Sequence, residues 1–567
     1  MDVSINTLLD NTHLQDLKQY PYAITFILLS ATILLTRLVS TLTSASKKVH
    51  NGAKTPPSVP YWIPLLGHIP NMALDADGFV KSLRAIYTEG IFTLNFGGSR
   101  HNIMFTLGLA TAMLNQKSTN ADNEGVSKRL MRLNFGFPAE ELDKYDAALD
   151  ELLAAYKHIQ VDPWLGDMVH QTARKARENV SNLVTFMESP VDQTPWEKVS
   201  NVKVIEGPDG EQVVEASLLP LIRDFCAFTA NPSIMGSDFL ENNPQFFDDI
   251  WTLDRGFLLL ATGLPRWAPI PVLTRAHIAR RNNLQRLDDF HNVLDQHWNG
   301  EKVDAKWSSL DDIGGLLKAR MEIYRKYDFS IRARASVEHA LMWAANANSN
   351  ALVFWMINRI YEDRALVAMI REEIAPYVEV QQQETGLPIS EPPRITKFDV
   401  EGLCNNCPLL KSCYVECLRV DTGSWSFKTI RQDFMLQSRE KDAQAWLLRK
   451  GDYAHVAHDL HNTDPTYWND PMVWRADRHI KYDDKKRGTT DMGSIRPYGG
   501  GSSMCKGRAF AFKEAMIFSA TLISIWDIEP RGRGAWKMPK HRKATGVFGT
   551  DDDTRVWLKR RKIPSTS

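Results

Sequence analysis

One short segment near the C-terminus, residues 498–508, contains the side chain with the clearest chemical potential, Cys505. The cysteine lies in a glycine-rich loop, and residues 509–516 after it are predicted to form a helix. Glycine lets the backbone turn sharply and approach a flat group closely. The N-terminus of the following helix would direct amide N–H groups towards the sulfur and favour its anionic form. The segment therefore indicates a site that offers a single thiolate, with a buried structural cysteine in a turn as the alternative.

Charged residues elsewhere in the C-terminal half have spacings that suit an ion-pair network. Glu416 and Arg419 are three residues apart, so on a helix they share a face and can form an ion pair. Arg478 follows later in the chain, after two Asp-Pro pairs at 464–465 and 470–471. A Glu-x-x-Arg pair alone is usually a solvated helical pair. The order of these features before the cysteine loop is what makes the pattern specific.

The spacing Tyr498-x-x-Gly501-x-x-x-Cys505-x-Gly507 resembles the haem-binding signature of the cytochrome P450 superfamily, with Tyr498 where phenylalanine is usual. The resemblance implies a bound haem b (iron protoporphyrin IX), with Cys505 as the metal ligand. Tyr498, Gly501 and Gly507 are then cofactor-binding residues of the same loop. A thiolate ligand pushes electron density onto haem iron and favours O–O cleavage.

The same resemblance assigns further residues around the cofactor. Glu416 and Arg419 match the ion pair of the family's K helix, and Arg478 matches the arginine that completes it, so the three are implied to hold the fold around the haem. The position two residues before the cysteine, often Arg or His in the family, is Ser503 here. The early helices contain no clear Trp-x-x-x-Arg, and Arg496 is the candidate partner for a haem propionate.

Residues 336–361 contain no Pro or Gly and are predicted to form one long helix. The resemblance implies that this helix crosses the haem face, where most members carry an acid followed by threonine. This chain has Asn348-Ser349 instead, followed by a Phe-Trp pair at 354–355, a pattern similar to the branch containing cholesterol 7α-hydroxylase, sterol 12α-hydroxylase and prostacyclin synthase. Ser349 is the candidate proton relay, and Asn348 can hold a water or a substrate oxygen. Capping or kinking of the helix by these residues is the alternative.

The resemblance implies a haem-thiolate monooxygenase that uses O2 to oxidise a lipophilic sterol- or terpenoid-like substrate. Within the family, the chain resembles fungal microsomal members of secondary metabolism. Electrons from NADPH would arrive through NADPH–cytochrome P450 reductase. An isomerase or dehydratase of an oxygenated lipid, which needs no reductase, is the alternative within the same fold. A non-catalytic haem protein is the alternative outside enzymes, although carriers of that kind use histidine as the iron ligand.

Four of the six cysteines form two close pairs, Cys404-x-x-Cys407 and Cys413-x-x-x-Cys417. Paired cysteines can indicate a zinc site. The pairs are closer together than usual zinc-finger spacings allow, and the second pair shares a helix with Glu416. A zinc site is therefore disfavoured, and disulfides are disfavoured if the domain faces the reducing cytosol.

The composition is that of a large neutral globular protein. The chain has 567 residues, 43% of them hydrophobic, and Lys+Arg and Asp+Glu balance at 68 each, so nothing indicates a nucleic-acid partner. No linker or composition break separates residues 61–567, which we expect to form one cytochrome P450 catalytic domain. The expected fold is mainly α with a small β-sheet region: helices dominate residues 139–377, and residues 91–96 and 103–106 are predicted to pair as strands.

The N-terminal segment predicts one membrane anchor. Residues 19–36 carry no charge, and the apolar segment 19–46 is long enough to span a bilayer. Acidic rather than basic residues precede it, which disfavours a cleaved signal peptide. Lysines follow it, so the positive-inside rule predicts a luminal segment 1–18 and a cytosolic catalytic domain, single-pass in the endoplasmic reticulum membrane. A Pro-rich linker, 47–60, joins the anchor to the domain.

Overall fold

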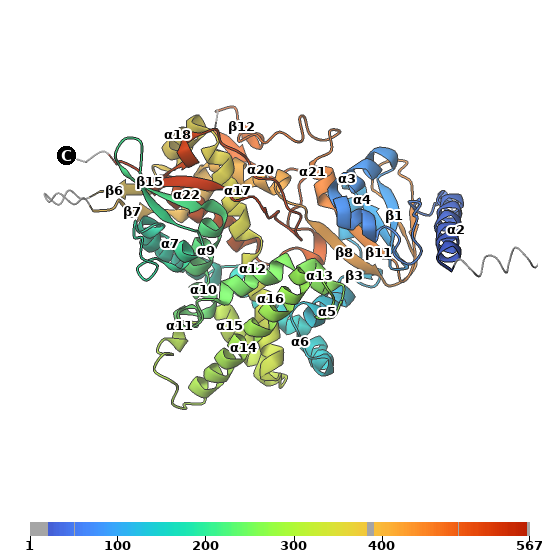
Figure 1. Cartoon of the computed structure of the whole chain (residues 1–567), viewed down its shortest axis with the longest axis horizontal. Coiled ribbons are helices and arrows are strands. Elements are labelled where there is room, and N and C mark those ends of the chain that lie inside the picture. The colour runs from blue at the N-terminus through green and yellow to red at the C-terminus, as the bar shows by residue number, and fades with distance from the viewer. Residues whose placement is uncertain (1–20, 50–51, 383–390, 486, 564–567) are drawn as a thin grey trace, which may run out of the picture. The chain divides into compact units, whose positions relative to one another are not determined.

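The computed structural model describes residues 21–49, 52–382, 391–485 and 487–563. The chain is mainly helical with small sheets, as predicted (Figure 1). It divides into two compact units. Unit 1 comprises residues 1–124, 426–461 and 500–503, and unit 2 comprises residues 125–425, 462–499 and 504–567.

Unit 1 is built on a five-stranded sheet of order β1-β2-β11-β8-β3. The strands are β1 (Ile91–Phe96), β2 (Ser99–Met104), β3 (Ala121–Asp122), β8 (Trp425–Ile430) and β11 (Tyr453–Ala457). β1 and β2 form an antiparallel hairpin, and β11 pairs with β2 in parallel. The pairing predicted from sequence is present, but the second strand begins at Ser99 and ends at Met104. The reason is the two-residue turn Gly97-Gly98, whose φ angles of 60° and 83° suit a tight hairpin and set its register.

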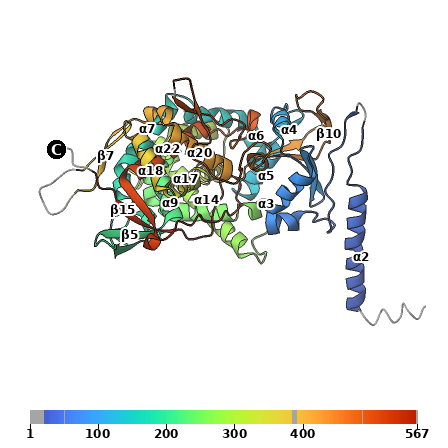
Figure 2. The same cartoon turned by 90° about the horizontal axis from the view of Figure 1, so that it is seen from above.

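The apolar N-terminal segment forms one helix, α2 (Pro21–Leu42), seen along its length in Figure 2. Its stretch Tyr22–Leu42 has a mean hydropathy of 1.9, and 6% of the residues in its most apolar window are buried. The helix is long and apolar enough to cross a membrane. The Arg37 guanidinium donates to the Pro60 carbonyl at 2.7 Å and lies 4.9 Å from the ring centroid of Trp62. The predicted luminal segment 1–18 and the first residues of the predicted anchor lie outside the described residues.

Unit 2 contains most of the helices. Those that matter for the site and its surroundings are α7 (Trp164–Asn179), α9 (Leu218–Ala230), α13 (Phe257–Ala261), α14 (Pro271–Trp298), α16 (Ile331–Asn346), α17 (Ser349–Tyr361), α18 (Arg364–Ile374), α20 (Pro408–Val420) and α22 (Arg508–Ile525). A four-stranded antiparallel sheet of order β14-β15-β5-β4 accompanies them: β4 (Lys203–Glu206), β5 (Gln212–Ser217), β14 (Trp526–Pro530) and β15 (Arg555–Arg560). The hairpin β4–β5 interrupts the region predicted as helical, because Pro208-Asp209-Gly210 forms its turn with Gly210 at φ 74°.

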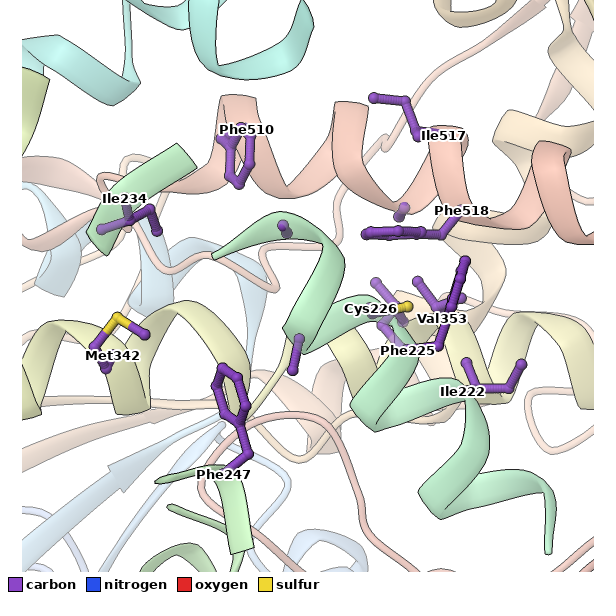
Figure 3. Close-up of a cluster of buried hydrophobic side chains, with 14 of the residues drawn as sticks. Ile222, Phe225, Cys226, Ile234, Phe247, Met342, Val353, Phe510, Ile517 and Phe518 are labelled. Carbon is purple, nitrogen blue, oxygen red and sulfur yellow. The ribbon is translucent and has the colours of Figure 1, made fainter. Parts of the chain in front are cut away.

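The core of unit 2 holds α9, α17 and α22 together. Figure 3 shows this cluster, in which Phe225 of α9, Val353 of α17 and Phe518 of α22 converge. The rings of Phe225 and Phe518 meet edge to face with centroids 5.7 Å apart. Tight packing of this kind fixes the relative positions of helices. The helix that follows Cys505 is thereby held against the helix that begins at Ser349.

The continuous helix predicted over 336–361 is interrupted: α16 ends at Asn346 and α17 begins at Ser349. At the interruption, Asn348 Oδ1 accepts from the Val547 amide at 2.9 Å. Asparagine readily bonds to backbone groups outside its own helix. Ala347 and Asn348, between the two helices, keep right-handed helical φ/ψ values, so the chain runs from α16 into α17 without leaving the helical region.

Candidate functional site

The loop before α22 is closed by its own backbone. The Cys505 amide donates to the Tyr498 carbonyl at 2.9 Å, and the Gly499 amide donates to the Arg496 carbonyl at 3.0 Å. Gly499 and Gly501 have φ angles of 71° and 62°, which residues with a side chain rarely adopt. The loop is followed by α22, which begins at Arg508, so Cys505 lies just before a helix N-terminus.

Cys505 differs from every other cysteine of the chain. Its side chain is exposed, whereas the other five are buried. Protein atoms nevertheless crowd the sulfur, and this burial raises the pKa of the Cys505 thiol above its ordinary value, although the Gly507 and Arg508 amides and the Arg508 charge act to lower it. The amides therefore point at the sulfur as expected from sequence, but they do not by themselves make it an anion. A metal ion deprotonates a coordinating thiol outright.

Tyr498, the residue that departs from the usual phenylalanine, has a hydroxyl partner. Its Oη forms a hydrogen bond with Oη of Tyr414 from α20. Burial raises the pKa of both phenols well above their ordinary range. The ring of Tyr414 also packs edge to face on Phe512 of α22, with centroids 5.3 Å apart. The loop is thus joined to α20 through a neutral pair of phenols.

The structure brings Glu416, Arg419 and Arg478 together. Arg419 makes a two-point contact, from Nε to Oε2 at 2.8 Å and from Nη2 to Oε1 at 2.7 Å. Arg478 Nε donates to Oε1 at 2.9 Å. The side chains of Glu416 and Arg419 are both fully buried. Arg419 Nη1 also donates to two backbone carbonyls, those of Asn462 at 2.8 Å and Pro471 at 2.7 Å.

Sequence reasoning missed two further donors to the Glu416 carboxylate. His479 Nε2 lies 2.9 Å from Oε2, and the Arg475 backbone amide donates to Oε1 at 3.1 Å. Burial alone would raise the pKa of Glu416, but bonds from Arg419, His479 and Arg478 hold it at about 2. The adjacency of His479 to Arg478 was the one available signal for its role. The carboxylate is therefore ionised at neutral pH, and it joins α20 to the segment 475–479.

At the interruption between α16 and α17, the two predicted site residues point to different partners. Ser349 Oγ donates to the Ala345 carbonyl at 2.8 Å. Asn348 Oδ1 accepts from the Val547 amide, and a Cβ atom at the neighbouring Gly546 would lie 2.1 Å from that oxygen. The glycine therefore lets the chain approach Asn348. The carboxamide oxygen of Asn348 is committed to the backbone, which leaves its amide nitrogen for other ligands.

An acid that sequence reasoning did not assign lies beside Ser349. Glu514 belongs to α22, is 4% exposed, and its carboxyl contacts the Ser349 side chain. Burial raises the pKa of Glu514 to about 8, and the serine contact acts in the opposite direction. The available signal was its position: Glu514 is the single acidic residue of α22, and although Lys513 directly precedes it, the residues three and four positions away on the helix are apolar.

Arg496, the predicted propionate partner, has a buried Nε atom with no hydrogen-bond partner among the described residues. A buried guanidinium nitrogen without a partner is costly and fits an anionic ligand such as a carboxylate. With an exposed thiol in a glycine loop, this donor set fits a haem held through Cys505. Elsewhere in the described ranges, no group of three or more His, Cys, Asp or Glu side chains is arranged to hold a metal ion.

A thiolate loop leading into a helix, on a mainly helical fold, defines a class of haem proteins. The cytochrome P450 family model matches residues 239–551, and the chain belongs to this family. Similar proteins include cytochrome P450 monooxygenase efuG of Hormonema carpetanum, 24% identical over 93% of this chain and 94% of that protein, and fsoE of Humicola fuscoatra, 22% identical over 92% and 90%. Cholesterol 7-alpha-monooxygenase of Cricetulus griseus is 26% identical over 64% of this chain and 66% of its own length. The protein is thus an enzyme of the monooxygenase family with a haem cofactor.

Proposed function

We propose that the protein inserts one oxygen atom from O2 into a lipophilic sterol- or terpenoid-like molecule, as a step of secondary-metabolite biosynthesis. The observation that carries the chemistry is the exposed Cys505 thiol with the Gly507 and Arg508 amides directed at it. The substrate class draws support from the relatives, two of them fungal monooxygenases and one named for its action on cholesterol. Electrons would come from NADPH through NADPH–cytochrome P450 reductase.

Each residue of the site has a part in this proposal. Cys505 holds the iron of haem b, and Arg496 binds a haem propionate with its free Nε. The haem, when bound, supplies the activation of dioxygen. Ser349 carries a proton at Oγ, and Asn348 orients water or substrate through its amide nitrogen.

An isomerase or dehydratase of an oxygenated lipid is the second candidate within the same fold. The observation in its favour is that Ser349 Oγ is bonded to the Ala345 carbonyl. A reaction that needs no proton delivery to dioxygen would tolerate such a serine. The two candidates differ in one measurable requirement, because only the monooxygenase consumes NADPH.

We further propose that α2 anchors the enzyme in the endoplasmic reticulum membrane with the catalytic domain in the cytosol. The support is its length and apolar surface, with Lys47 and Lys48 directly after it. The segment between α13 and α14 exposes Trp267 at 84% and Leu264 at 40%, which suits a membrane interface. Deletion of residues 1–46 should release protein to a milder wash and keep the haem spectrum. Full-length protein in the soluble fraction would contradict the anchor.

The experiment that tests the chemistry uses full-length enzyme with the reductase. We expect the carbon monoxide complex to show the red-shifted band of a thiolate haem, and Cys505→Ser to lose both this band and all activity. A panel of sterols, terpenoids and fatty acids is then screened for a shift of the haem absorption band. Retention of the thiolate band in Cys505→Ser would overturn the ligand assignment. Turnover without NADPH and reductase would overturn the monooxygenase in favour of the isomerase.

A further inference from the structure

We propose that the hydrogen bond between the hydroxyls of Tyr498 and Tyr414 holds Cys505 in the position from which its sulfur binds iron. We define Tyr414, a residue of α20, and Tyr498, a residue of the cysteine loop, as the tyrosine pair. Both are positioning residues, because they act through Cys505 and not on the substrate. The inference rests on the proposed role of Cys505 as the iron ligand, and it adds the contact that keeps this ligand in place.

Tyr498 connects α20 to Cys505 through two hydrogen bonds. Its side-chain hydroxyl is bonded to the Tyr414 hydroxyl, and its backbone carbonyl accepts from the Cys505 amide at 2.9 Å. One residue thus carries both bonds of a direct connection between a helix of unit 2 and the cysteine. A shift of the Tyr498 side chain would therefore move the backbone group to which Cys505 is bonded.

The backbone directly after Tyr498 consists of three glycines, residues 499–501, and Gly499 and Gly501 have φ angles of 71° and 62°. Glycine has more conformational freedom to lose on folding than any other residue, so this run does little to hold its own shape. The contact at Tyr498 fixes the residue from which the run starts. A further side-chain bond to the loop, from Gln160 Nε2 to the Lys506 carbonyl at 3.1 Å, lies after the cysteine and leaves the glycines unrestrained.

Tyr414 is a firm point of attachment for the loop. Its side chain is fully buried, and it lies two residues before Glu416 in α20. The Glu416 carboxylate joins α20 to the segment 475–479. The helix that receives the Tyr498 hydroxyl is thus itself held by a buried ion-pair cluster.

α20 also contacts the chain on the far side of the cysteine. The ring of Tyr414 packs edge to face on Phe512 of α22, with centroids 5.3 Å apart. Lys411 Nζ, one turn earlier in α20, lies 5.3 Å from the centroid of the same phenylalanine ring. Tyr414 therefore contacts the residue before the glycines through its hydroxyl and the helix after the cysteine through its ring, so both flanks of Cys505 meet at one side chain.

The hydroxyl bond has a role that ring packing alone cannot fill, because Tyr414 is buried. With phenylalanine at position 498 the aromatic contact would remain, but the Tyr414 hydroxyl would lose the partner it has among the described residues. A buried polar group without a partner costs more than its bond contributes, whereas removal of both partners is nearly neutral. Loss of one hydroxyl should therefore loosen the loop more than loss of both.

The first test follows the red-shifted carbon monoxide band of the haem-loaded, full-length enzyme, which reports thiolate ligation and needs no substrate. The carbon monoxide complex is held a few degrees below the unfolding temperature, and the rate at which the band disappears is measured. We expect Tyr498→Phe and Tyr414→Phe each to lose the band about two- to tenfold faster than the wild type, the range that one hydrogen bond accounts for. Equal rates in the wild type and both variants would overturn the proposal.

The second test combines the two substitutions in one protein. If the two hydroxyls act through a single bond, their effects do not add, and the double variant should lose the band no faster than the faster single variant. Rates that multiply would show that the two tyrosines act separately, and would overturn the proposal.

A matched control separates positioning of the cysteine from general stability. Tyr361→Phe removes another buried phenol hydroxyl of unit 2, which donates to the Trp526 carbonyl at 2.6 Å and joins α17 to β14. We expect this variant to unfold at a lower denaturant concentration and to keep the wild-type rate of band loss. The same acceleration in Tyr361→Phe as in Tyr498→Phe would mean that the tyrosine pair acts only through overall stability, and would overturn the inference.

The outcomes also separate this inference from the proposed function. A wild type without the red-shifted band would remove the role of Cys505 itself. A wild type that shows the band, with tyrosine variants that keep it equally long, would remove only the tyrosine pair. If one single variant does not fold, the rate of the other, measured against Tyr361→Phe, decides the matter.

Discussion

Two glutamates of unit 2, Glu416 on α20 and Glu514 on α22, are both buried. At neutral pH, Glu416 is ionised and Glu514 is largely protonated. Glu416 has side-chain partners in Arg419, Arg478 and His479, and its pKa is about 2. Glu514 contacts a serine, and its pKa is about 8. Burial raises the pKa of both carboxyls, so the partners make the difference. Burial beside cations keeps a carboxyl ionised at neutral pH, and burial without them keeps it largely protonated.

The two residues also affect stability in opposite ways as the pH changes. The folded-state pKa of Glu416 is depressed, so its contribution is present above the ordinary value of 4.5 and is lost as the pH falls towards about 2. The folded-state pKa of Glu514 is raised, so the folded chain binds more protons there than the unfolded chain between pH 4.5 and about 8. The free energy of unfolding therefore falls across that interval as the pH rises.

The largest effect is expected from substitutions that break the ion-pair cluster of Glu416, Arg419 and Arg478. Glu416→Ala or Arg419→Ala leaves an uncompensated buried charge, which costs about 3–5 kcal/mol and should yield protein without stable haem. Haem content and denaturant unfolding of purified protein measure the loss. Arg364→Ala is the matched control: it removes an arginine whose side chain is 83% exposed in its pair with Glu529, and it should cost less than about 1 kcal/mol. Normal haem loading in both cluster variants would show that the pair has no structural role.

A smaller effect is expected from substitution of His479, because it removes only one of the side-chain partners of Glu416. His479→Ala deletes a hydrogen bond to a charged group, worth about 1.5–3 kcal/mol, while both arginines remain. We expect haem to be retained with a lower unfolding midpoint. The acid limb of the stability curve should also move to higher pH, because Glu416 then ionises less readily. An unchanged acid limb would mean that the arginines alone determine the pKa of Glu416.

The smallest expected effect concerns Glu514. Glu514→Gln cannot ionise, so its stability relative to the wild type should rise steadily between pH 5 and pH 8. Denaturant unfolding at several pH values gives the difference directly. Ser519→Ala, which removes no ionisable group, should show no such trend. A variant that loses stability as the pH rises would place Glu514 among the ionised, partnered carboxylates, like Glu416.

The comparison shows which parts of the site are readable from a sequence. Glu416 and Arg419 are three residues apart, and Cys505 and its glycines lie within one loop, so local spacing predicts their proximity. His479 and Glu514 reach their partners only through packing: His479 meets Glu416 across 63 positions, and Glu514 meets Ser349 from a different helix. The absence of Pro and Gly also predicted one helix over 336–361, whereas a bond from Val547 to Asn348 accompanies its interruption.

The sequence by itself determined the glycine-rich cysteine loop, the apolar N-terminal helix and the mainly helical class, because each depends on the types and spacing of residues close together in the chain. Only the tertiary structure decided the charge of each buried carboxyl. That charge depends on which donors the fold brings within a few ångströms, and for Glu416 two of the three side-chain partners, Arg478 and His479, come from a distant segment of the chain. The contact of Asn348 with the Val547 amide, 199 positions further along the chain, also exists only in the tertiary structure.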